Sequence, residues 1–335
     1  MKHLSIFLLI VSTTLTFEIK ADESIPYQNR PDVIDFIEMM HNKHGLDKEE
    51  LKELFSSVNF QERVVRIMNR QPEGTMTWSS YKNMMVTDER VDSGKQFISE
   101  YKKDLKRAED IYGVPASIIA SIIGIETRYG KITGNIRVLD SLSTLSFDYP
   151  RRAKFFKVQL EEFLLLAEEE NWDPSNIKGS IAGAMGFGQF MPDSYRNYAV
   201  DFDFDGKRDI LNNPVDAIGS VANFLNKKGK WEPNTKIVLK ATHSGERPEL
   251  KSSFKPYIKV SDLKSFGITP VEKLQNQLRV IPIELEIEIK GKLEIEKGYE
   301  YWLGLKNYQA ISRYNRSKLY IMAVYEFSES LAEFF

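Results

Sequence analysis

One glutamate stands at the end of a stretch whose apolar character would withdraw its carboxyl group from water. Glu126 closes the run Pro115-Ala-Ser-Ile-Ile-Ala-Ser-Ile-Ile-Gly-Ile-Glu126, and Thr-Arg-Tyr-Gly follows it. A carboxyl group in an apolar setting keeps its proton more readily, and a glycosidase needs a protonated acid to donate to the leaving oxygen. Glu126 is therefore a candidate general acid. The alternative is a structural glutamate that pairs with Arg128 or accepts backbone hydrogen bonds.

A glycine-rich segment offers a second candidate site. Three glycines occur within the first six residues of Gly183-Ala-Met-Gly-Phe-Gly-Gln-Phe-Met-Pro192, and glycine lets a backbone approach a ligand closely. Gln189 adds an amide beside the aromatic ring of Phe190. The same glycines would also serve a tight turn or close helix packing. The segment is not a phosphate-binding loop, because no Gly-Lys-Ser/Thr sequence follows it.

Spaced carboxylates predict a cation site. The sequence Asp201-Phe-Asp-Phe-Asp-Gly-Lys-Arg-Asp209 has Asp at alternating positions and Gly at the sixth, which matches the first half of a calcium-binding loop. The twelfth position holds Asn212 where a bidentate Glu is usual, so Asp216 would close a longer loop. An acidic turn is the alternative, although close carboxylates repel one another unless a cation neutralises them. The predicted ligands are Asp201, Asp203, Asp205, the carbonyl of Lys207, Asp209 as an auxiliary ligand, and Asp216.

Helices must position these groups. Apolar residues recur at three- and four-residue spacing from Asp32 to about Asn69, which is typical of amphipathic helices. The run after Pro115 is apolar or small on every side and predicts a helix that is buried all round, with Pro115 suited to its first turn. Further helices are predicted over residues 91–112, 150–171, 214–227 and 317–335.

The pattern changes to strands between about Lys236 and Lys297. Apolar and acidic residues alternate from Ile283 to Ile289, which is typical of a half-buried strand. Shorter β-leaning runs occur at 237–239 and 257–260. We predict a small mixed or β-rich domain inserted between helical regions.

The N-terminus and the composition bear on where the protein acts. Residues 1–21 combine a basic start, an apolar run from Leu4 to Phe17 and a small residue at Ala21, as in a secretory signal peptide; an uncleaved membrane anchor is the alternative. The chain has no cysteine, which excludes disulfides and a lipid-modified N-terminal Cys. Its net charge is −2 with no block of like charges, which argues against nucleic acid as the main partner.

Taken in order, five segments resemble the B-type family of lytic murein transglycosylases, which have a goose-lysozyme-like core. The segments are Ile123-Gly-Ile-Glu-Thr-Arg-Tyr-Gly130, Leu142-Ser-Thr-Leu-Ser-Phe-Asp-Tyr-Pro-Arg-Arg152, residues 180–192, the loop from 201 to 216, and Arg313-Tyr-Asn-Arg-Ser317. With the resemblance we expect a mainly α (α+β) fold. Its expected parts are a signal peptide (1–21), an N-terminal helical domain (22–105), a lysozyme-like catalytic core with an EF-hand-like calcium loop at 201–216 (106–235), the inserted mixed or β-rich domain (236–297), and a C-terminal segment and helix (298–335).

The resemblance also implies roles for the residues that match. Glu126 falls at the family's single catalytic acid/base position, and Arg151 and Arg152 would face the anionic peptide stems. The chain departs from the family pattern at Ile125, where Val is common, and at Phe204, where Gly is frequent. The positions at or near the sugar groove are Ser180, Gln189, Phe190, Tyr81, Tyr308, Tyr314, Asn315 and Tyr320.

The implied reaction cleaves the bond between N-acetylmuramic acid and N-acetylglucosamine in peptidoglycan. Glu126 would protonate the glycosidic oxygen and then take a proton from the muramic C6 hydroxyl, which closes a 1,6-anhydro ring. A hydrolytic muramidase of the same fold and a catalytically silent wall-binding protein are the alternatives. The resemblance implies a periplasmic monomer that uses a structural Ca²⁺ and no organic cofactor, with glycan strands as its substrate and cell-wall machinery proteins as candidate partners.

Overall fold

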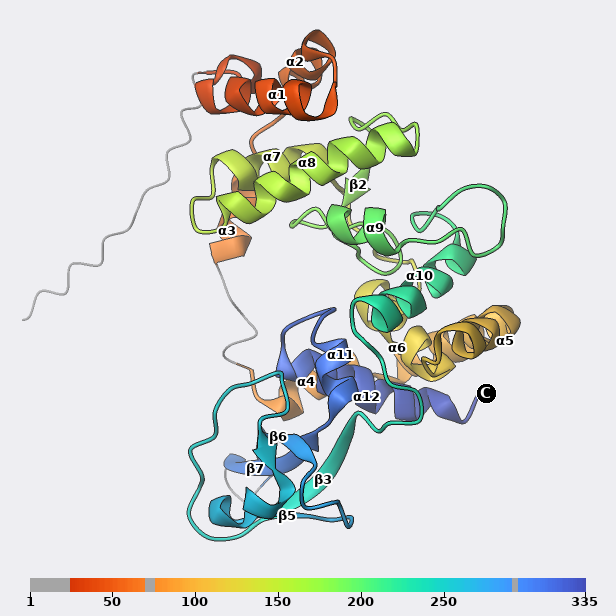
Figure 1. Cartoon of the computed structure of the whole chain (residues 1–335), viewed down its shortest axis with the longest axis vertical. Helices are drawn as coiled ribbons and strands as arrows, with labels where there is room; N and C mark the ends of the chain where they lie inside the picture. Colours follow the sequence, from red (N-terminus) through yellow and green to blue (C-terminus); the bar gives the residue numbers. More distant parts are fainter. Residues whose placement is uncertain (1–24, 70–75, 291–294) are drawn as a thin grey trace, which may run out of the picture. The chain divides into compact units, whose positions relative to one another are not determined.

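The computed structural model describes residues 25–69, 76–290 and 295–335 (Figure 1). The predicted signal peptide at 1–21 lies outside these residues. The chain divides into two compact units, one that ends at Ser57 and one that extends from Val58 to Phe335. All of the candidate site residues belong to the second unit.

The first unit is helical. Pro31 occupies the first turn of its longer helix, where a backbone N–H would have no hydrogen-bond partner within the helix, so proline costs nothing there. Gly45 ends that helix at a left-handed φ of 76°. The side chain of Asp47 caps the next helix by accepting two backbone hydrogen bonds. The rings of Phe36 and Phe55 meet edge to face with centroids 6.0 Å apart. The elements are η1 (Tyr27–Asn29), α1 (Pro31–His44) and α2 (Lys48–Ser56).

The second unit is mainly helical and also contains two sheets. No single helix among the described residues is long and apolar enough to cross a membrane. The helices are α3 (Glu62–Asn69), α4 (Trp78–Met85), α5 (Asp88–Tyr112), α6 (Ala116–Thr127), α7 (Val138–Phe147), α8 (Ala153–Glu169), α9 (Pro192–Tyr198), α10 (Pro214–Lys227), η3 (Val260–Phe266), α11 (Lys306–Ile311) and α12 (Lys318–Ala332). The strands are β1 (Ile136–Arg137), β2 (Lys178–Gly179), β3 (Val238–His243), β4 (Ile258–Lys259), β5 (Ile268–Pro270), β6 (Arg279–Lys290) and β7 (Ile295–Gly304).

Helix α6 forms the centre of the helical part. Ten of its twelve residues are buried, all except Ser117 and Glu126, and it packs against α5, α10 and α12. The helix follows α5 after a bend of 115°, and Gly113 makes the turn with a φ of 70°. A Cβ atom on Gly124 would lie 2.7 Å from the ring of Phe327 in α12, so the glycine permits this close approach. The position of Glu126 is therefore fixed by a buried helix.

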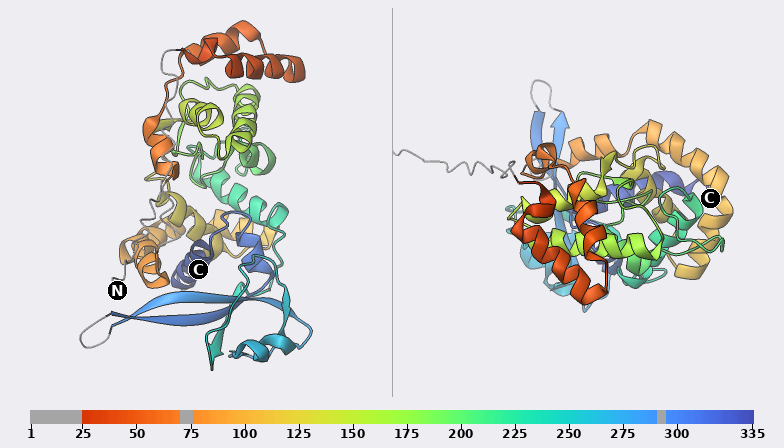
Figure 2. Two further views of the ribbon diagram at one scale, coloured as in Figure 1. Left: turned by 90° about the vertical axis from the view of Figure 1, so that its left-hand side faces the viewer. Right: turned by 90° about the horizontal axis from the view of Figure 1, so that it is seen from above.

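The larger sheet is antiparallel, with strand order β4-β6-β7-β3-β5. Figure 2 shows β6 and β7 as its long, curled central pair. Leu239, Leu263, Val280 and Leu303 belong to a separate apolar core on this sheet. Strand β7 continues to Gly304, which is beyond the boundary at 297 that we expected from the sequence.

Comparison with the predicted elements shows where the sequence was informative. The prediction of a mainly α fold with a small β-rich part is confirmed. Helix α10 coincides with the predicted range, and α8 and α12 lie within theirs. The predicted single helix at 91–112 begins at Asp88 and is interrupted at Tyr101, where φ is −110° and ψ is 22°. Helices α4, α7, α9 and α11 were not predicted.

Candidate active site

The carboxyl group of Glu126 lies at the C-terminal end of α6 and is partly exposed. Residue 128 ends the helix in the left-handed conformation with φ of 50°, and Tyr129 and Gly130 continue it at 59° and 85°. The hydroxyl of Thr127 donates to the carbonyl of Phe187 at 2.9 Å and accepts from the N–H of Gly130 at 3.0 Å. These bonds tie the end of the helix to the glycine-rich segment, so that segment lies beside Glu126.

A buried tyrosine contacts the Glu126 carboxyl group directly. The hydroxyl of Tyr320, in α12, donates to Oε1 of Glu126 at 2.6 Å. Burial raises the pKa of the Tyr320 phenol well above its ordinary value, and the charge of Glu126 raises it further. Tyr320 therefore stays protonated and acts as a donor. A donor favours the carboxylate, which is the form that Glu126 would take after giving up its proton.

The glycine-rich segment folds into a tight hairpin. Met185 and Phe190 pair through two backbone hydrogen bonds of 2.9 Å, and Gln189 makes the turn at a φ of 50°. The Gln189 amide nitrogen donates to the carbonyls of Thr133 and Gly186 at 3.0 Å each. The side chain that we expected in the sugar groove therefore also braces the turn.

Helix α11 and the residues after it hold the other side of the hairpin. The hydroxyl of Tyr314 donates to the carbonyl of Gly188 at 2.5 Å, and its ring meets the buried ring of Phe190 edge to face at 5.9 Å. Burial raises the pKa of Tyr314 well above its ordinary value, with the charge of Glu126 as the second cause. The charge of Glu126 thus contributes to the raised pKa of both Tyr314 and Tyr320.

The remaining predicted groove residues occupy several places. Tyr81 of α4 is 2% exposed and close enough to Tyr320 to influence its pKa. The hydroxyl oxygen of Ser180 accepts from the N–H groups of Ala182 and Ala184 at 3.4 and 3.1 Å, at the base of the hairpin. Asn315 directly follows Tyr314 and is partly buried.

Three of the predicted residues make other contacts within the part of the chain that the structure describes. Arg151 and Arg152 are exposed in the turn before α8, where the Arg152 guanidinium lies 4.3 Å from the centroid of Phe155. Tyr308 is 1% exposed and stacks on Phe254. The described contacts therefore bring together a smaller set around Glu126 than the sequence indicated.

Two residues near the site were not predicted. Thr127 was only noted as a neighbour of Glu126, although it links the helix to the hairpin. Arg90 of α5 is 9% exposed and donates to the carbonyls of Met84 and Met85 at 3.0 and 2.7 Å. Burial lowers its pKa, and Arg128 contributes to the same effect. The sequence does not indicate that an arginine in a polar-faced helix is buried. The hydroxyl of Thr127 could have been predicted as a site residue, because it directly follows Glu126.

The acidic loop brings three carboxylates together. Oxygen atoms of Asp201, Asp203 and Asp216 lie within 4.8 Å of one another. Asp216 is buried, which raises its pKa, although the N–H groups of residues 202 and 209 donate to it at 2.7 and 2.8 Å. Phe204 takes a left-handed φ of 65°, which explains in steric terms why glycine suits this position. Asp216 is the buried member of the cluster, Asp201 is half-buried and Asp203 is exposed. Such a cluster of carboxylate oxygens fits a hard divalent cation.

The other predicted ligands have different partners. A carboxylate oxygen of Asp205 accepts from the N–H of Lys207 at 2.9 Å. One oxygen of Asp209 accepts from the N–H groups of Leu211 and Asn212 at 3.0 Å each. Among the described acidic side chains, those of Asp205 and Asp209 are not part of the close cluster.

The comparisons with known proteins agree with this architecture. The model of the family described as "Transglycosylase SLT domain" matches residues 28–329. The chain belongs to this transglycosylase family. It is a lytic transglycosylase, like the relatives that it resembles over most of its length.

Three relatives illustrate the range of similarity within this transglycosylase family. The membrane-bound lytic murein transglycosylase B of Escherichia coli K12 is 42% identical over 91% of this chain and 84% of its own. The structure of Escherichia coli lytic transglycosylase Slt35 in complex with calcium is 43% identical, with a TM-score of 0.81, and covers 91% of this chain and 94% of its own. SltB3 from Pseudomonas aeruginosa, solved in complex with NAG-NAM-pentapeptide, is 28% identical, with a TM-score of 0.75, over 90% of this chain and 79% of its own.

The contact between Tyr320 and Glu126 makes a first prediction. Tyr320→Phe removes the donor while keeping the ring, and a hydrogen bond to a charged group contributes about 1.5–3 kcal/mol. We expect kcat of the transglycosylase to fall about tenfold or more and the melting temperature to fall by a few degrees, because the same bond also stabilises the folded protein. Initial rates over a substrate series give kcat and KM separately.

Tyr325→Phe is the matched control, because Tyr325 lies in the same helix and its hydroxyl forms no hydrogen bond with the residues that the structure describes. Its kcat should equal that of the unaltered protein. Equal losses in the two variants, or no loss in Tyr320→Phe, would contradict a role for the Tyr320 hydroxyl.

Proposed function

We propose that this lytic transglycosylase cuts the glycan strands of peptidoglycan between N-acetylmuramic acid and N-acetylglucosamine, with Glu126 as its acid/base group. The observation that carries the proposal is the hydrogen bond of 2.6 Å between the Tyr320 hydroxyl and the carboxyl group at the end of a buried helix. The substrate assignment is supported by relatives, one named a murein transglycosylase and one crystallised with NAG-NAM-pentapeptide. Such a substrate lies outside the cytoplasm, in keeping with the predicted export signal and the proposed periplasmic location.

In the proposed reaction the proton of Glu126 passes to the glycosidic oxygen as the bond from that oxygen to muramic C1 breaks. The substrate's acetamido group stabilises the positive charge that develops at C1. The Glu126 carboxylate, with Tyr320 donating to it, then removes the proton of the muramic C6 hydroxyl. The new bond from O6 to C1 closes a 1,6-anhydro ring, and Glu126 is protonated again. No water is consumed.

A single acid/base group favours ring closure over hydrolysis. Hydrolytic glycosidases typically use two carboxyl groups, whereas Glu126, the carboxylate that Tyr320 contacts, is our one candidate acid/base group. An intramolecular hydroxyl has an effective concentration on the order of 10⁵ M or more when it is well aligned. The hairpin with Gln189, together with Tyr314 and Asn315, is our candidate for holding the muramic ring in that alignment.

We further propose that Asp201, Asp203 and Asp216 hold a structural calcium ion. The support is their clustering within 4.8 Å and the calcium complex of the relative Slt35. The ion would neutralise the mutual repulsion of the three carboxylates. Ile210, inside this loop, accepts a backbone hydrogen bond from Phe187 at 3.1 Å, so the loop supports the hairpin rather than the chemistry.

Glu126→Gln tests the acid/base assignment. The amide keeps the size and polarity of the side chain but cannot donate and recover a proton, so we expect the rate of muropeptide release from purified sacculi to fall by about 10² or more. Circular dichroism and the melting temperature should stay close to those of the unaltered protein. A variant that kept more than a tenth of the rate would show that another group carries the reaction.

The mass of the product separates ring closure from hydrolysis. Anhydro-muropeptides should be about 18 Da lighter than their hydrolytic counterparts, the mass of the water that is not added, and borohydride should not change their mass. A predominance of reducing ends would support a muramidase. A folded protein that releases nothing from sacculi would support a silent wall-binding protein instead.

The calcium proposal predicts a rise in stability that depends on particular carboxylates. Calcium at a hundredfold excess over its Kd should stabilise the protein by roughly 2.7 kcal/mol, which is about 5 °C in melting temperature for a unit of this size. Asp203→Asn should abolish most of this rise, whereas Asp205→Asn, outside the cluster, should retain it. Differential scanning calorimetry with calcium or a chelator measures the effect. Equal responses of the two variants would contradict the ligand set.

The pH dependence of this rise follows from Asp216. Burial raises the pKa of Asp216 in the folded protein, because desolvation disfavours the carboxylate. Without a bound ion, protonation of Asp216 removes this cost as the pH falls through that pKa. A bound cation requires the carboxylate form, so the stabilisation by calcium should shrink over the same range.

A further inference from the structure

A small basic hollow of about 180 Å³ lies between the loop after β3 and the segment that follows α11. Its lining contains three cationic side chains, those of Lys255, Arg313 and Arg316, and no carboxylate. The chain as a whole has a net charge of −2. The hollow is therefore positively charged on a protein whose remaining residues are net acidic, and the proposed chemistry at Glu126 does not use it.

The three cations of the hollow differ from other cations of this chain in their lack of a counter-ion. Arg137, for example, forms an ion pair of 2.5 Å with Asp140. By contrast, Lys255, Arg313 and Arg316 form no ion pair with a carboxylate in the part of the chain that the structure describes. Like charges gathered without counter-ions raise the energy of the unbound protein and favour an anionic ligand.

Aromatic packing holds one of these cations in place. The Arg316 guanidinium lies 5.3 Å from the centroid of the Phe254 ring. That ring is stacked on the ring of Tyr308, at an angle of 13° and with 6.3 Å between centroids. Because Tyr308 is buried, the stack is fixed to the protein interior. A guanidinium held in this way loses less conformational freedom when it binds an anion.

The backbone that carries the two arginines is held as well. The N–H groups of residues 313 and 314 continue the turn of α11 by donating to its carbonyls at 3.1 and 2.9 Å. Between the two arginines, the Tyr314 hydroxyl donates to the carbonyl of Gly188 at 2.5 Å. Arg313 and Arg316 therefore extend from a fixed segment, and both side chains line the same hollow.

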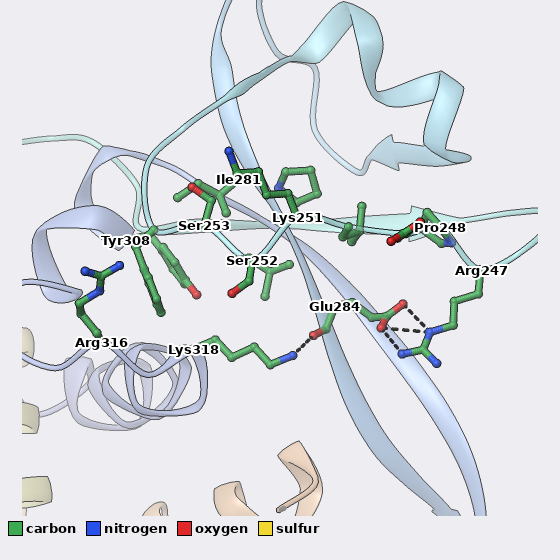
Figure 3. Close-up of a pocket in the computed structure, with 15 residues that line it drawn as sticks. Arg247, Pro248, Lys251, Ser252, Ser253, Ile281, Glu284, Tyr308, Arg316 and Lys318 are labelled. Atoms are coloured by element: carbon green, nitrogen blue, oxygen red, sulfur yellow. Dashed lines mark hydrogen bonds and ion pairs between the residues drawn. The ribbon is translucent and has the colours of Figure 1, made fainter. Parts of the chain in front are cut away.

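The opposite wall of the hollow is a turn that hydrogen bonds stabilise. The Ser253 hydroxyl accepts from the N–H of Lys255 at 3.1 Å and donates to the carbonyl of the same residue at 2.9 Å. The Ser252 hydroxyl and the Gln309 side-chain amide also line the hollow. Neither group forms a hydrogen bond with the described residues, so both are free to donate to a ligand. Figure 3 shows Ser252 and Ser253 on the loop and Arg316 on the helical side.

A larger pocket of about 650 Å³ adjoins the hollow (Figure 3). At its other end Arg247 and Glu284 form a forked ion pair with hydrogen bonds of 2.6–3.1 Å, so that end is close to neutral. Residues 281–283 of β6 add an apolar wall. The pocket therefore has room for an uncharged group attached to an anion in the hollow. The lining residues that the two spaces share are Ser252, Ser253, Phe254 and Arg316.

We propose that the basic hollow binds the phosphate group of a phosphate monoester, with the rest of the ligand in the adjoining pocket. Such a phosphate carries a charge of about −1.5 to −2 at pH 7 and three terminal oxygens, which suit the three cations Lys255, Arg313 and Arg316 on two walls. A carboxylate has one charge and two oxygens and would leave part of the positive charge uncompensated. Binding at this hollow is independent of the reaction proposed for Glu126.

Isothermal titration calorimetry of the full protein with glycerol 3-phosphate tests the site, at low ionic strength because salt screens exposed charges. We expect saturable binding, and a loss of about tenfold or more in affinity when Lys255→Gln is combined with Arg313→Gln. Arg316 stays unaltered, because its contact with Phe254 supports the wall. Acetate should bind to the unaltered protein at least about tenfold more weakly than glycerol 3-phosphate.

Arg63→Gln with Lys264→Gln is the matched control, because it also removes one arginine and one lysine, both exposed and outside the hollow and the pocket. This control should bind glycerol 3-phosphate as the unaltered protein does. No saturable binding, an equal loss in the control, or an equal affinity for acetate would overturn the proposal.

Vesicles of phosphatidylcholine, with and without phosphatidic acid, distinguish two sources of the phosphate. Cosedimentation that requires phosphatidic acid, is prevented by glycerol 3-phosphate and is lost in the Lys255→Gln, Arg313→Gln variant would support the site with a lipid headgroup as its ligand. Saturable binding of glycerol 3-phosphate without cosedimentation would support the site with a soluble phosphate ester as its ligand.

Discussion

The structure depends on the burial of α6. Five of its isoleucines are buried, and each such side chain contributes about 1.5–3 kcal/mol of transfer free energy, so this helix is stable only when α5, α10 and α12 surround it. That gain exceeds the few kcal/mol that desolvation of one partly buried carboxyl group costs. Glu126 can therefore be held at an unfavourable place. The apolar helix supplies both the position of the carboxyl group and the free energy that keeps it there.

A neutral phenol contacts this carboxyl group directly. Burial raises the pKa of Tyr314 and of Tyr320 well above their ordinary values, which favours the protonated, donating form of both. A lysine or arginine in the same place would favour the carboxylate much more strongly and would hinder protonation of the leaving oxygen. The Tyr320 hydroxyl also favours the carboxylate, but as a neutral donor it does so less strongly than a cation would. It is thus compatible with the proposed role of Glu126 as a group that first gives and then takes a proton.

The sequence predicted well those elements whose patterns are local. Helix α6 was predicted from the uniformly apolar residues after Pro115, which indicate an element buried on all sides. Strand β6 was predicted from the alternation between Ile283 and Ile289, which indicates an element buried on one side. Helix α7 was missed since its sequence, Val-Leu-Asp-Ser-Leu-Ser-Thr-Leu-Ser-Phe, is rich in residues of modest helix propensity, and tertiary packing decides its state.

The site was harder to predict than the fold for the same reason. Glu126 and Gln189 stood out by their immediate neighbours, and the resemblance indicated Tyr320. Nothing local distinguishes Arg90, whose guanidinium donates to the carbonyls of Met84 and Met85 at the end of α4, or Tyr308, which is buried and stacks on Phe254. The stacking of Tyr308 arises from a contact between segments that are distant in sequence. The spacing did predict that Asp216 closes the acidic cluster. It did not reveal that the Asp209 carboxylate caps its own turn.

The hairpin at 185–190 is where the parts of the site meet. Thr127 holds it from α6, Ile210 holds it from the acidic loop, and Tyr314 holds it from the segment after α11. None of these bonds involves Glu126 itself. A disturbance of the acidic loop would therefore reach Glu126 through the hairpin and through Thr127, the residue that directly follows it.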